Sequence, residues 1–380
     1  MLTQAGIGVG KLSRGSKNLE ALLEAIHDNP DDDAPRLVYA DALLERGDPR
    51  GEFISLQLRP ELDRDAKKRE KELLTVYGKQ WLGDLAPVVM AGYEFARGFL
   101  SECKVDNRHV DRLRKLAGHP AWATVRTISG SALIALHPVM KGLRRLSFTS
   151  YEARNHEELP SSWNDLLVGT ERPIEALRYA GVQTDEHWED ALENNDSVRP
   201  GVQGRWIYVP QAQEVAALCS CSALPKLREL VVVASPDLIV APLSGSQLIH
   251  RLDTIGFVFD YRGTWTVDRG PALALFASML RDAPTNHLRF ELGPDYHTTF
   301  LELTRGGDVG YRTATLTVGP TTNSPWSEIL INEAIGVLDS LPATVRELRI
   351  TTRRDTDLQQ VARLRAAAEQ MKLDLCDVGY

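Results

Sequence analysis

Pairs of apolar residues two positions apart recur along most of the chain, and this recurrence constrains the fold more than any other feature. The clearest copy lies in residues 224–233, with the sequence LPKLRELVVV. Alternate side chains of a strand point to opposite faces, so Leu230 and Val232 are expected to face a core. The recurring pairs are Leu146/Phe148, Leu177/Tyr179, Trp206/Tyr208, Leu230/Val232, Ile255/Phe257, Leu288/Phe290, Leu316/Val318 and Leu348/Ile350.

The spacing of these pairs indicates repeating strand–helix units. With Ile128 as the first member, the strands start near 128, 146, 177, 206, 230, 255, 288, 316 and 348, which gives gaps of 18, 31, 29, 24, 25, 33, 28 and 32 residues. Such gaps are typical of leucine-rich repeats with some long members. Helical patterns fall between the strands at 213–218, 271–280, 328–341 and 358–371, and the last is expected to close the array.

The array departs from the standard leucine-rich pattern, which has Asn or Cys three residues after the second strand anchor. The corresponding residues here are Tyr151, Val182, Gln211, Ser235, Asp260, Gly293, Thr321 and Arg353. We therefore predict an α/β chain in which a small N-terminal helical module precedes an irregular leucine-rich-repeat-like α/β solenoid. The alternative is an ordinary α/β domain, because short apolar strands recur in any parallel sheet.

The N-terminal part has strong helical signals. Leu19, Leu22, Leu23 and Ile26 form one apolar stripe, and Asp33 before Pro35 is a candidate N-cap. We expect the module's core to contain Leu22, Ile26, Leu37, Leu44 and Phe53. We expect the polar residues Asp31, Asp32, Arg46, Asp48 and Arg50 to lie largely exposed, with capping and turn roles.

Residues 29–58, NPDDDAPRLVYADALLERGDPRGEFISLQL, resemble the repeat-companion domain found ahead of leucine-rich-repeat-like arrays in large bacterial genomes. The resemblance covers about residues 19–58, and Ala42 stands where the family usually has tryptophan. It implies a helical module attached to a repeat scaffold, without an established enzymatic activity. The expected organisation is a disordered leader at 1–17, the module at 18–60, a connecting helical segment at 61–94 and the array at 95–380.

Composition limits the classes of function. The net charge of −8 argues against a protein whose main role is to grip nucleic acid. The four cysteines are too few for a disulfide framework, so a reducing cytoplasm is expected. The sequence has no apolar run long enough for a transmembrane helix, so we predict no membrane partner. The glycine-rich start departs from a phosphate-binding loop, because Ala5 replaces its first glycine and Leu12 follows Lys11.

No pattern in the sequence predicts catalysis, a cofactor or a metal site. Cys219 and Cys221 have no histidine nearby in the sequence to act as a base, so they are interpreted as small apolar residues. The acidic run at 185–190 offers only His187 and Asp190 as a well-placed pair of ligands, and a metal site needs a third. Short basic clusters such as Arg144-Arg145 lack interleaved aromatic residues, which disfavours nucleic-acid binding.

We therefore predict a non-catalytic scaffold or regulator, an adaptor or inhibitor that binds another protein in a bacterial multi-protein system. The alternatives are an enzyme whose site is assembled from distant residues and a nucleic-acid-binding protein. The predicted binding face is the side of the strands opposite the core, where aliphatic residues are flanked by arginines. A strand face covered from within the protein explains the same pattern equally well. The candidate binding residues are Arg178, Arg205, Ile207, Val209, Val231, Val233, Val258, Arg289 and Arg349.

Overall fold

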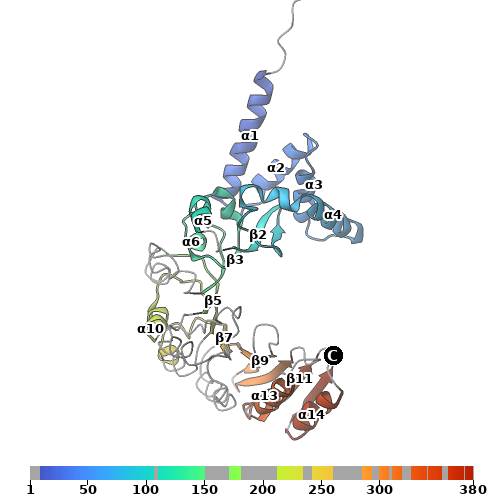
Figure 1. Ribbon diagram of the computed structural model, residues 1–380, viewed down its shortest axis with the longest axis vertical. Coiled ribbons are helices and arrows are strands. Elements are labelled where there is room, and N and C mark those ends of the chain that lie inside the picture. The colour runs from blue at the N-terminus through green and yellow to red at the C-terminus, as the bar shows by residue number, and fades with distance from the viewer. Residues whose placement is uncertain are drawn as a thin grey trace, which may run out of the picture. The chain divides into compact units, whose positions relative to one another are not determined.

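The protein is a mixed α/β chain, and the strands of its described residues form an open twelve-stranded sheet whose strand order follows the chain (Figure 1). The chain forms two compact units, Met1–Ser147 and Phe148–Tyr380. The predicted boundary after residue 94 therefore differs from the observed division, which places the first strands with the helices. The computed structural model describes residues 9–106, 110–149, 171–180, 212–233, 242–259, 285–292, 299–307, 310–318, 327–339, 341–352, 358–371 and 373–379.

The first unit begins with four helices. Helix α1 starts at Val9, within the segment that the sequence suggested as a disordered leader, and residues 1–8 lie outside the described part. Extending an existing helix costs little compared with nucleating one, which explains why the strong helical pattern after residue 18 continues backwards. The helices are α1 (Val9–Asp28), α2 (Ala34–Leu44), α3 (Pro49–Gln57) and α4 (Arg64–Trp81), followed by the short 3-10 helix η1 (Gly83–Leu85).

The core of this helical module differs from the prediction on α2. Ile26 and Phe53 are buried as expected, but Leu37 and Leu44 are 52% and 46% exposed. The prediction placed them on the inner face because they share a helical period with Ala40. The buried face of α2 instead contains Arg36, Tyr39, Ala40 and Leu43. Two adjacent faces of α2 both have residues at helical spacing. The face that packs into the core is the one that contains Arg36.

A two-strand hairpin joins the helical module. Strands β1 (Glu94–Ala96) and β2 (Phe99–Lys104) are antiparallel, and Arg97 and Gly98 between them have φ values of 54° and 83°. A Cβ atom on Gly98 would lie 2.1 Å from Ile54 Cγ1, so this tight contact requires glycine. The turn directs Phe99 into the cluster formed by the helices. The series of apolar pairs did not include this hairpin.

The rest of the first unit contains two short repeats that the apolar pairs only partly reveal. His119-Pro120 and His137-Pro138 precede β3 and β4, and each histidine Nδ1 accepts a hydrogen bond from the backbone N–H two residues later, at 3.3 and 3.2 Å. Strands β2, β3 and β4 are parallel. The elements are α5 (Val110–Leu116), the 3-10 helix η2 (Pro120–Thr124), β3 (Thr127–Ser129), α6 (Ala132–Ala135) and β4 (Arg145–Thr149).

Most of the predicted strands are confirmed. Six of the predicted pairs lie within strands β4, β5, β6, β7, β8 and β11, and in β10 Leu316 is followed by Val318 just after the strand. The pair Trp206/Tyr208 lies outside the described residues. The strands are β5 (Ala176–Ala180), β6 (Glu229–Val233), β7 (Thr254–Phe259), β8 (His287–Leu292), β9 (Thr299–Arg305), β10 (Tyr311–Thr317), β11 (Glu347–Thr351) and β12 (Leu375–Gly379).

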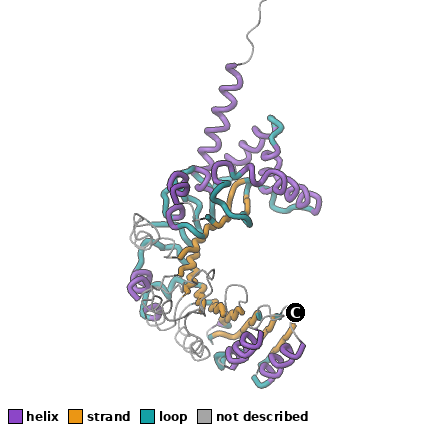
Figure 2. The backbone as a smooth tube through the Cα atoms, in the orientation of Figure 1, coloured by secondary structure: helices purple, strands orange, loops and turns teal. Residues whose placement is uncertain are grey.

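Three of the four predicted helices are confirmed as α10 (Ala212–Ser220), α13 (Ser327–Asp339) and α14 (Leu358–Glu369). The fourth, at 271–280, lies outside the described residues. Helices α13 and α14 lie on the same side of the C-terminal strands (Figure 2). The row of side chains beneath these helices, exemplified by Leu288, Leu303 and Leu348, is buried.

In the described part of the second unit, two strands were missed. Strand β9 is antiparallel to both β8 and β10, so the second unit is not a uniform series of parallel strands. The gap of 28 residues between the anchors at 288 and 316 was interpreted as one repeat, although it contains the additional pair Leu301/Leu303. Strand β12 follows α14, so the expected closing helix is not the last element. Among the described helices, none combines the length and the apolar character needed to cross a membrane.

Neighbouring residues on α2 provide a matched test of this core. Replacing buried Leu43 with alanine should lower the free energy of unfolding by about 2–5 kcal/mol, because it leaves a cavity. Replacing half-exposed Leu44 with alanine should change it by less than about 1 kcal/mol. Chemical denaturation of both variants measures the difference, and a larger loss for Leu44→Ala would contradict the observed orientation of α2.

The buried environment of His27 predicts a pH dependence. Burial, reinforced by the positive charges of His119, Arg50 and Arg36, lowers the pKa of His27 to about 4. In the unfolded chain, the His27 imidazole has a pKa of about 6.5 and binds a proton below that pH. The folded state therefore loses stability as the pH falls from about 6.5 to about 4. In His27→Gln this loss is absent. Thermal denaturation should therefore show the wild type losing melting temperature relative to the variant between about pH 7 and about pH 5. An unchanged difference would show that His27 does not titrate in this way.

Candidate functional site

The strand face opposite the core in the second unit carries a continuous row of side chains. Backbone pairing aligns one residue from each strand, so the row follows directly from the register of the sheet. We call it the Arg178 row. It consists of Arg178, Val231, Gly256, Arg289, Glu302, Thr315, Arg349 and Asp377, on β5 to β12 in that order. Four of the predicted binding residues belong to this row, namely Arg178, Val231, Arg289 and Arg349.

A bidentate ion pair ties the N-terminal part of this face together. The two terminal guanidinium nitrogens of Arg178 donate to the two carboxylate oxygens of Glu291, at 2.7 and 2.8 Å. Arg178 lies on β5 and Glu291 lies on β8, three strand spacings of about 4.8 Å away. Both side chains must therefore extend along the sheet, across β6 and β7. Glu291 is only 6% exposed, and these donors offset the free-energy cost of burying its carboxylate.

Arg289 is the second arginine beside Glu291. Its Nε lies 3.5 Å from a Glu291 oxygen, and its guanidinium also lies 3.8 Å from Glu302. The same guanidinium lies over the ring of Phe300, 4.9 Å from its centre. Glu291 therefore lies between two cations, and each of them keeps a partly exposed side chain. On this part of the face, the two arginines are therefore balanced by the carboxylates of Glu291 and Glu302.

The prediction of an exposed aliphatic patch is wrong at Val231, because this side chain is only 6% exposed. Gly256 has no side chain, and Val231 occupies the space beside it, since a Cβ atom on Gly256 would lie 2.7 Å from Val231 Cγ2. The extended Arg178 side chain crosses the same region. Val231 therefore agrees with the alternative interpretation, in which the strand is covered on both sides.

The remaining predicted residues divide into two groups. Arg349 is strongly exposed, with 67% of its side chain accessible, and its Nε lies 3.9 Å from Asp377. Val233 and Val258 lie on β6 and β7, but their side chains are not among those described. Arg205, Ile207 and Val209 lie outside the described residues.

Glu291 was missed by sequence reasoning, although a signal was present. In the segment HLRFEL of β8, alternation places Glu291 on the same face as Arg289. A carboxylate on an otherwise basic strand face is a natural partner for arginine. The sequence does not reveal that Arg178, far earlier in the chain, supplies the bidentate contact.

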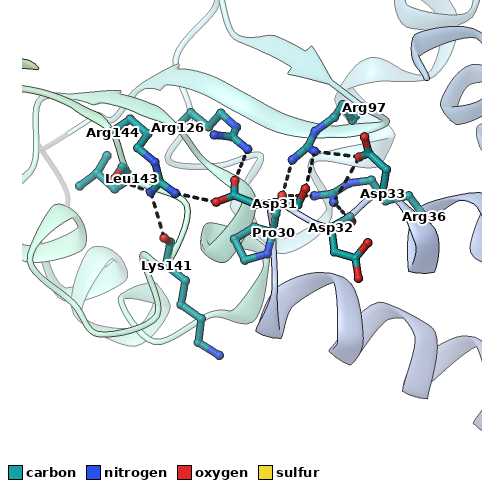
Figure 3. Close-up of polar contacts among 10 residues, drawn as sticks. All are labelled: Pro30, Asp31, Asp32, Asp33, Arg36, Arg97, Arg126, Lys141, Leu143 and Arg144. Carbon is teal, nitrogen blue, oxygen red and sulfur yellow. Dashed lines mark hydrogen bonds and ion pairs between the residues drawn. The ribbon is translucent and has the colours of Figure 1, made fainter. Parts of the chain in front are cut away.

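A second cluster of charged residues surrounds the loop at residues 30–33 in the first unit (Figure 3). The Asp31 carboxylate accepts hydrogen bonds from Arg126 and, at 2.7 Å, from Arg144. Arg97 donates to the Asp33 carboxylate at 2.7 Å and to the Asp31 carbonyl at 3.1 Å. Burial alone would raise the pKa of Asp31, but the hydrogen bond and charge of Arg126 hold it below its usual value. The cluster fixes the loop between α1 and α2 to the ends of the nearby strands.

Buried Arg36 completes this loop from the other side. It donates to the carbonyls of Pro30 and Asp32, at 2.9 and 2.5 Å. Asp33 occupies the N-cap position of α2 but makes no capping hydrogen bond, and Asp32 accepts from the Ala34 N–H instead, at 2.9 Å. The expected cap is therefore supplied by the neighbouring aspartate. Only the Nε of Arg36 lacks a partner among the contacts described for this loop, so the cluster is best explained as structural.

Arg50 departs from its expected exposure. Its guanidinium lies 4.8 Å from the centre of the Phe99 ring and donates to the Gly98 carbonyl at 3.3 Å. Burial lowers its pKa. The other expected roles hold better, since Asp31, Asp32 and Arg46 are exposed and the Asp48 carboxylate caps α3 through the Arg50 N–H at 2.9 Å.

The described thiols have no sign of activation. Burial raises the pKa of Cys103 to about 12, and burial also raises the pKa of Cys219. A nucleophilic cysteine needs the opposite shift. Within the described ranges, no group of three or more His, Cys, Asp or Glu side chains could hold a metal ion. The acidic run at 185–190 lies outside those ranges.

Comparisons with models of known protein families, with curated proteins and with solved structures found no match. The resemblance to the repeat-companion domain therefore rests on its motif alone.

The two carboxylates beside Arg289 provide a matched pair for testing the face. Glu291→Gln should lower the free energy of unfolding by about 2 kcal/mol, because it weakens charge-assisted hydrogen bonds to a buried group. Glu302→Gln removes an exposed partner of the same arginine and should cost less than about 1 kcal/mol. Chemical denaturation measures both values. Equal stabilities for the two variants would contradict the role assigned to Glu291.

Proposed function

We propose that the chain is a non-catalytic protein-binding scaffold or regulator, an adaptor or inhibitor working in the bacterial cytoplasm. The observation that carries this proposal is the Arg178 row. Its C-terminal part presents exposed charges of both signs at regular intervals, including Glu302, Arg349 and Asp377. A strand face with aligned, partly exposed charges suits recognition of a protein surface, because complementary charges fix both partner and register.

We further propose that the chain is built as an irregular leucine-rich-repeat-like α/β solenoid. A repeated backbone contact supports this architecture in the second unit. The Glu175 carbonyl accepts hydrogen bonds from two consecutive N–H groups, those of Arg228 and Glu229, at 2.9 and 3.0 Å. The Arg228 carbonyl accepts in the same way from Asp253 and Thr254, at 2.8 and 3.1 Å. Equivalent positions of successive repeats then form one broad binding surface.

The charge pattern defines the kind of partner that fits. The binding surface of the proposed partner carries alternating acidic and basic groups and a polar rim. It makes no apolar contact with Val231, because this side chain is buried. Exposed ion pairs such as Arg349–Asp377, with 3.9 Å between Arg349 Nε and a carboxylate oxygen, are weak enough to exchange for pairs with a partner.

Partner capture from the native host tests this function. Tagged wild-type chain should retain at least one specific protein, identified by mass spectrometry, and Arg349→Glu should reduce its recovery about tenfold. The matched control is Lys68→Glu, which makes the same charge change at an exposed residue of α4. Both variants should keep the wild-type melting temperature. Undiminished recovery with Arg349→Glu would contradict a binding role for this face.

A further inference from the structure

One edge of strand β12 pairs with β11. No strand among the described residues pairs with its other edge. The pairing with β11 is parallel, and the Leu375 N–H donates to the Arg346 carbonyl at 3.2 Å. Backbone groups alternate in direction along a strand, so the N–H and C=O of Cys376 point away from β11. An open edge of this kind can pair with another strand.

The row of side chains that faces the core is uncovered at β12. Cys376 is in register with Leu348, which is buried, whereas Cys376 itself is exposed. Leu375, on the other face of β12, is also exposed. The apolar layer that α13 and α14 cover over β11 therefore continues to an exposed end at β12.

Helix α14 presents an apolar stripe in addition to its buried face. Val361, Leu364 and Ala368 face the interior. Leu358, which is 73% exposed, is followed on the same face by Ala362 and Ala366, both exposed. Residues four apart on a helix lie one above the other, so these three form a continuous surface that another helix can approach closely.

Two exposed residues of α14 with opposite charges lie near Cys376. The pKa of the Cys376 thiol is raised by partial burial and by the charges of Asp377 and Glu369, while Arg365 acts in the opposite direction. These influences place Arg365 and Glu369 within electrostatic reach of the thiol. Because they are four residues apart, Arg365 and Glu369 lie one above the other on the same exposed flank of α14.

We propose that this end of the second unit binds a second copy of the chain, with β12 antiparallel to the partner's β12 and α14 against the partner's α14. A two-fold axis through Cys376 brings Arg365 opposite the partner's Glu369, and Glu369 opposite the partner's Arg365. Cys376 then exchanges two backbone hydrogen bonds with its equivalent. An axis through Asp377 would instead oppose two carboxylates, which disfavours that register.

A second copy fits this surface better than an unrelated protein because the surface is complementary to itself. A two-fold interface requires every charged residue to meet its opposite in the same patch, which Arg365 and Glu369 provide. The pairing extends the sheet across the interface and covers the Ala362 and Ala366 stripe. Arg365 and Glu369 on α14 do not belong to the Arg178 row, although β12 contributes Asp377 to it. Exchange of these two charges therefore tests the dimer separately from the proposed function.

Charge exchange on α14 tests the proposed dimer. Sedimentation equilibrium of the full chain should show a dimer, and Arg365→Glu or Glu369→Arg alone should raise its dissociation constant at least about tenfold. The double variant should restore wild-type association, because each residue again meets its opposite. A wild type that stays monomeric at every accessible concentration overturns the proposal, as does a dimer that is unaffected by either single variant or not restored by the double variant.

Cross-linking locates the interface independently of charge. The short reagent bis(maleimido)ethane should link two chains through Cys376, giving a covalent dimer in denaturing electrophoresis. Cys376→Ser should abolish this product, whereas the matched Cys221→Ser should retain it. A covalent dimer that persists in Cys376→Ser, or no dimer with the wild type, contradicts the placement of Cys376 at the two-fold axis.

Discussion

The register of β5 to β12 is the constraint on which both faces of the second unit depend. One continuous alignment places Leu177, Leu230 and Ile255 in the buried layer, and the same alignment places Arg178, Val231 and Gly256 on the opposite face. A shift of one residue in any strand would exchange the two sets. The buried aliphatic layer therefore also determines which charged residues can meet, and Arg178 reaches Glu291 only because every intervening strand keeps this register.

In the first unit, by contrast, two arginine side chains pack against the hydrophobic core. Arg36 and Arg50 both lie over the ring of Phe99, with guanidinium carbons 5.5 and 4.8 Å from its centre. Phe99 comes from the first hairpin and the arginines come from α2 and α3, so this contact joins strand to helix. Burial lowers the pKa of Arg36 to about 10, which leaves it charged at neutral pH. Its donors can therefore satisfy the carbonyls of the loop before α2.

The sequence predicts most of the described strands and helices of this protein, but it does not predict which distant residues contact one another. Pairs such as Leu230/Val232 locate strands because period-2 burial is local. The prediction of the buried face of α2 was wrong because Leu37 and Leu44 follow the same helical period as the face that is buried. The burial of Arg36 distinguishes the two faces, and the sequence pattern does not predict a buried arginine. Strand β9 was missed because a spacing of anchors does not distinguish a hairpin from a helical crossover. The Arg178–Glu291 pair joins residues 113 positions apart, which no local pattern could reveal.

The antiparallel strand β9 has a consequence for the curvature of its own unit. In an array of strand–helix repeats, each strand adds about 4.8 Å of width on one side and each helix adds about 8–10 Å on the other, so the layers bend. Residues 293–298 and 306–310, the connections on either side of β9, are too short to contain a crossover helix. Strand β9 therefore widens the sheet without widening the helical layer. If the unit is such an array, the mismatch that bends it is reduced at β9, and we expect the face around Glu302 and Thr315 to be flatter than the face crossed by Arg178.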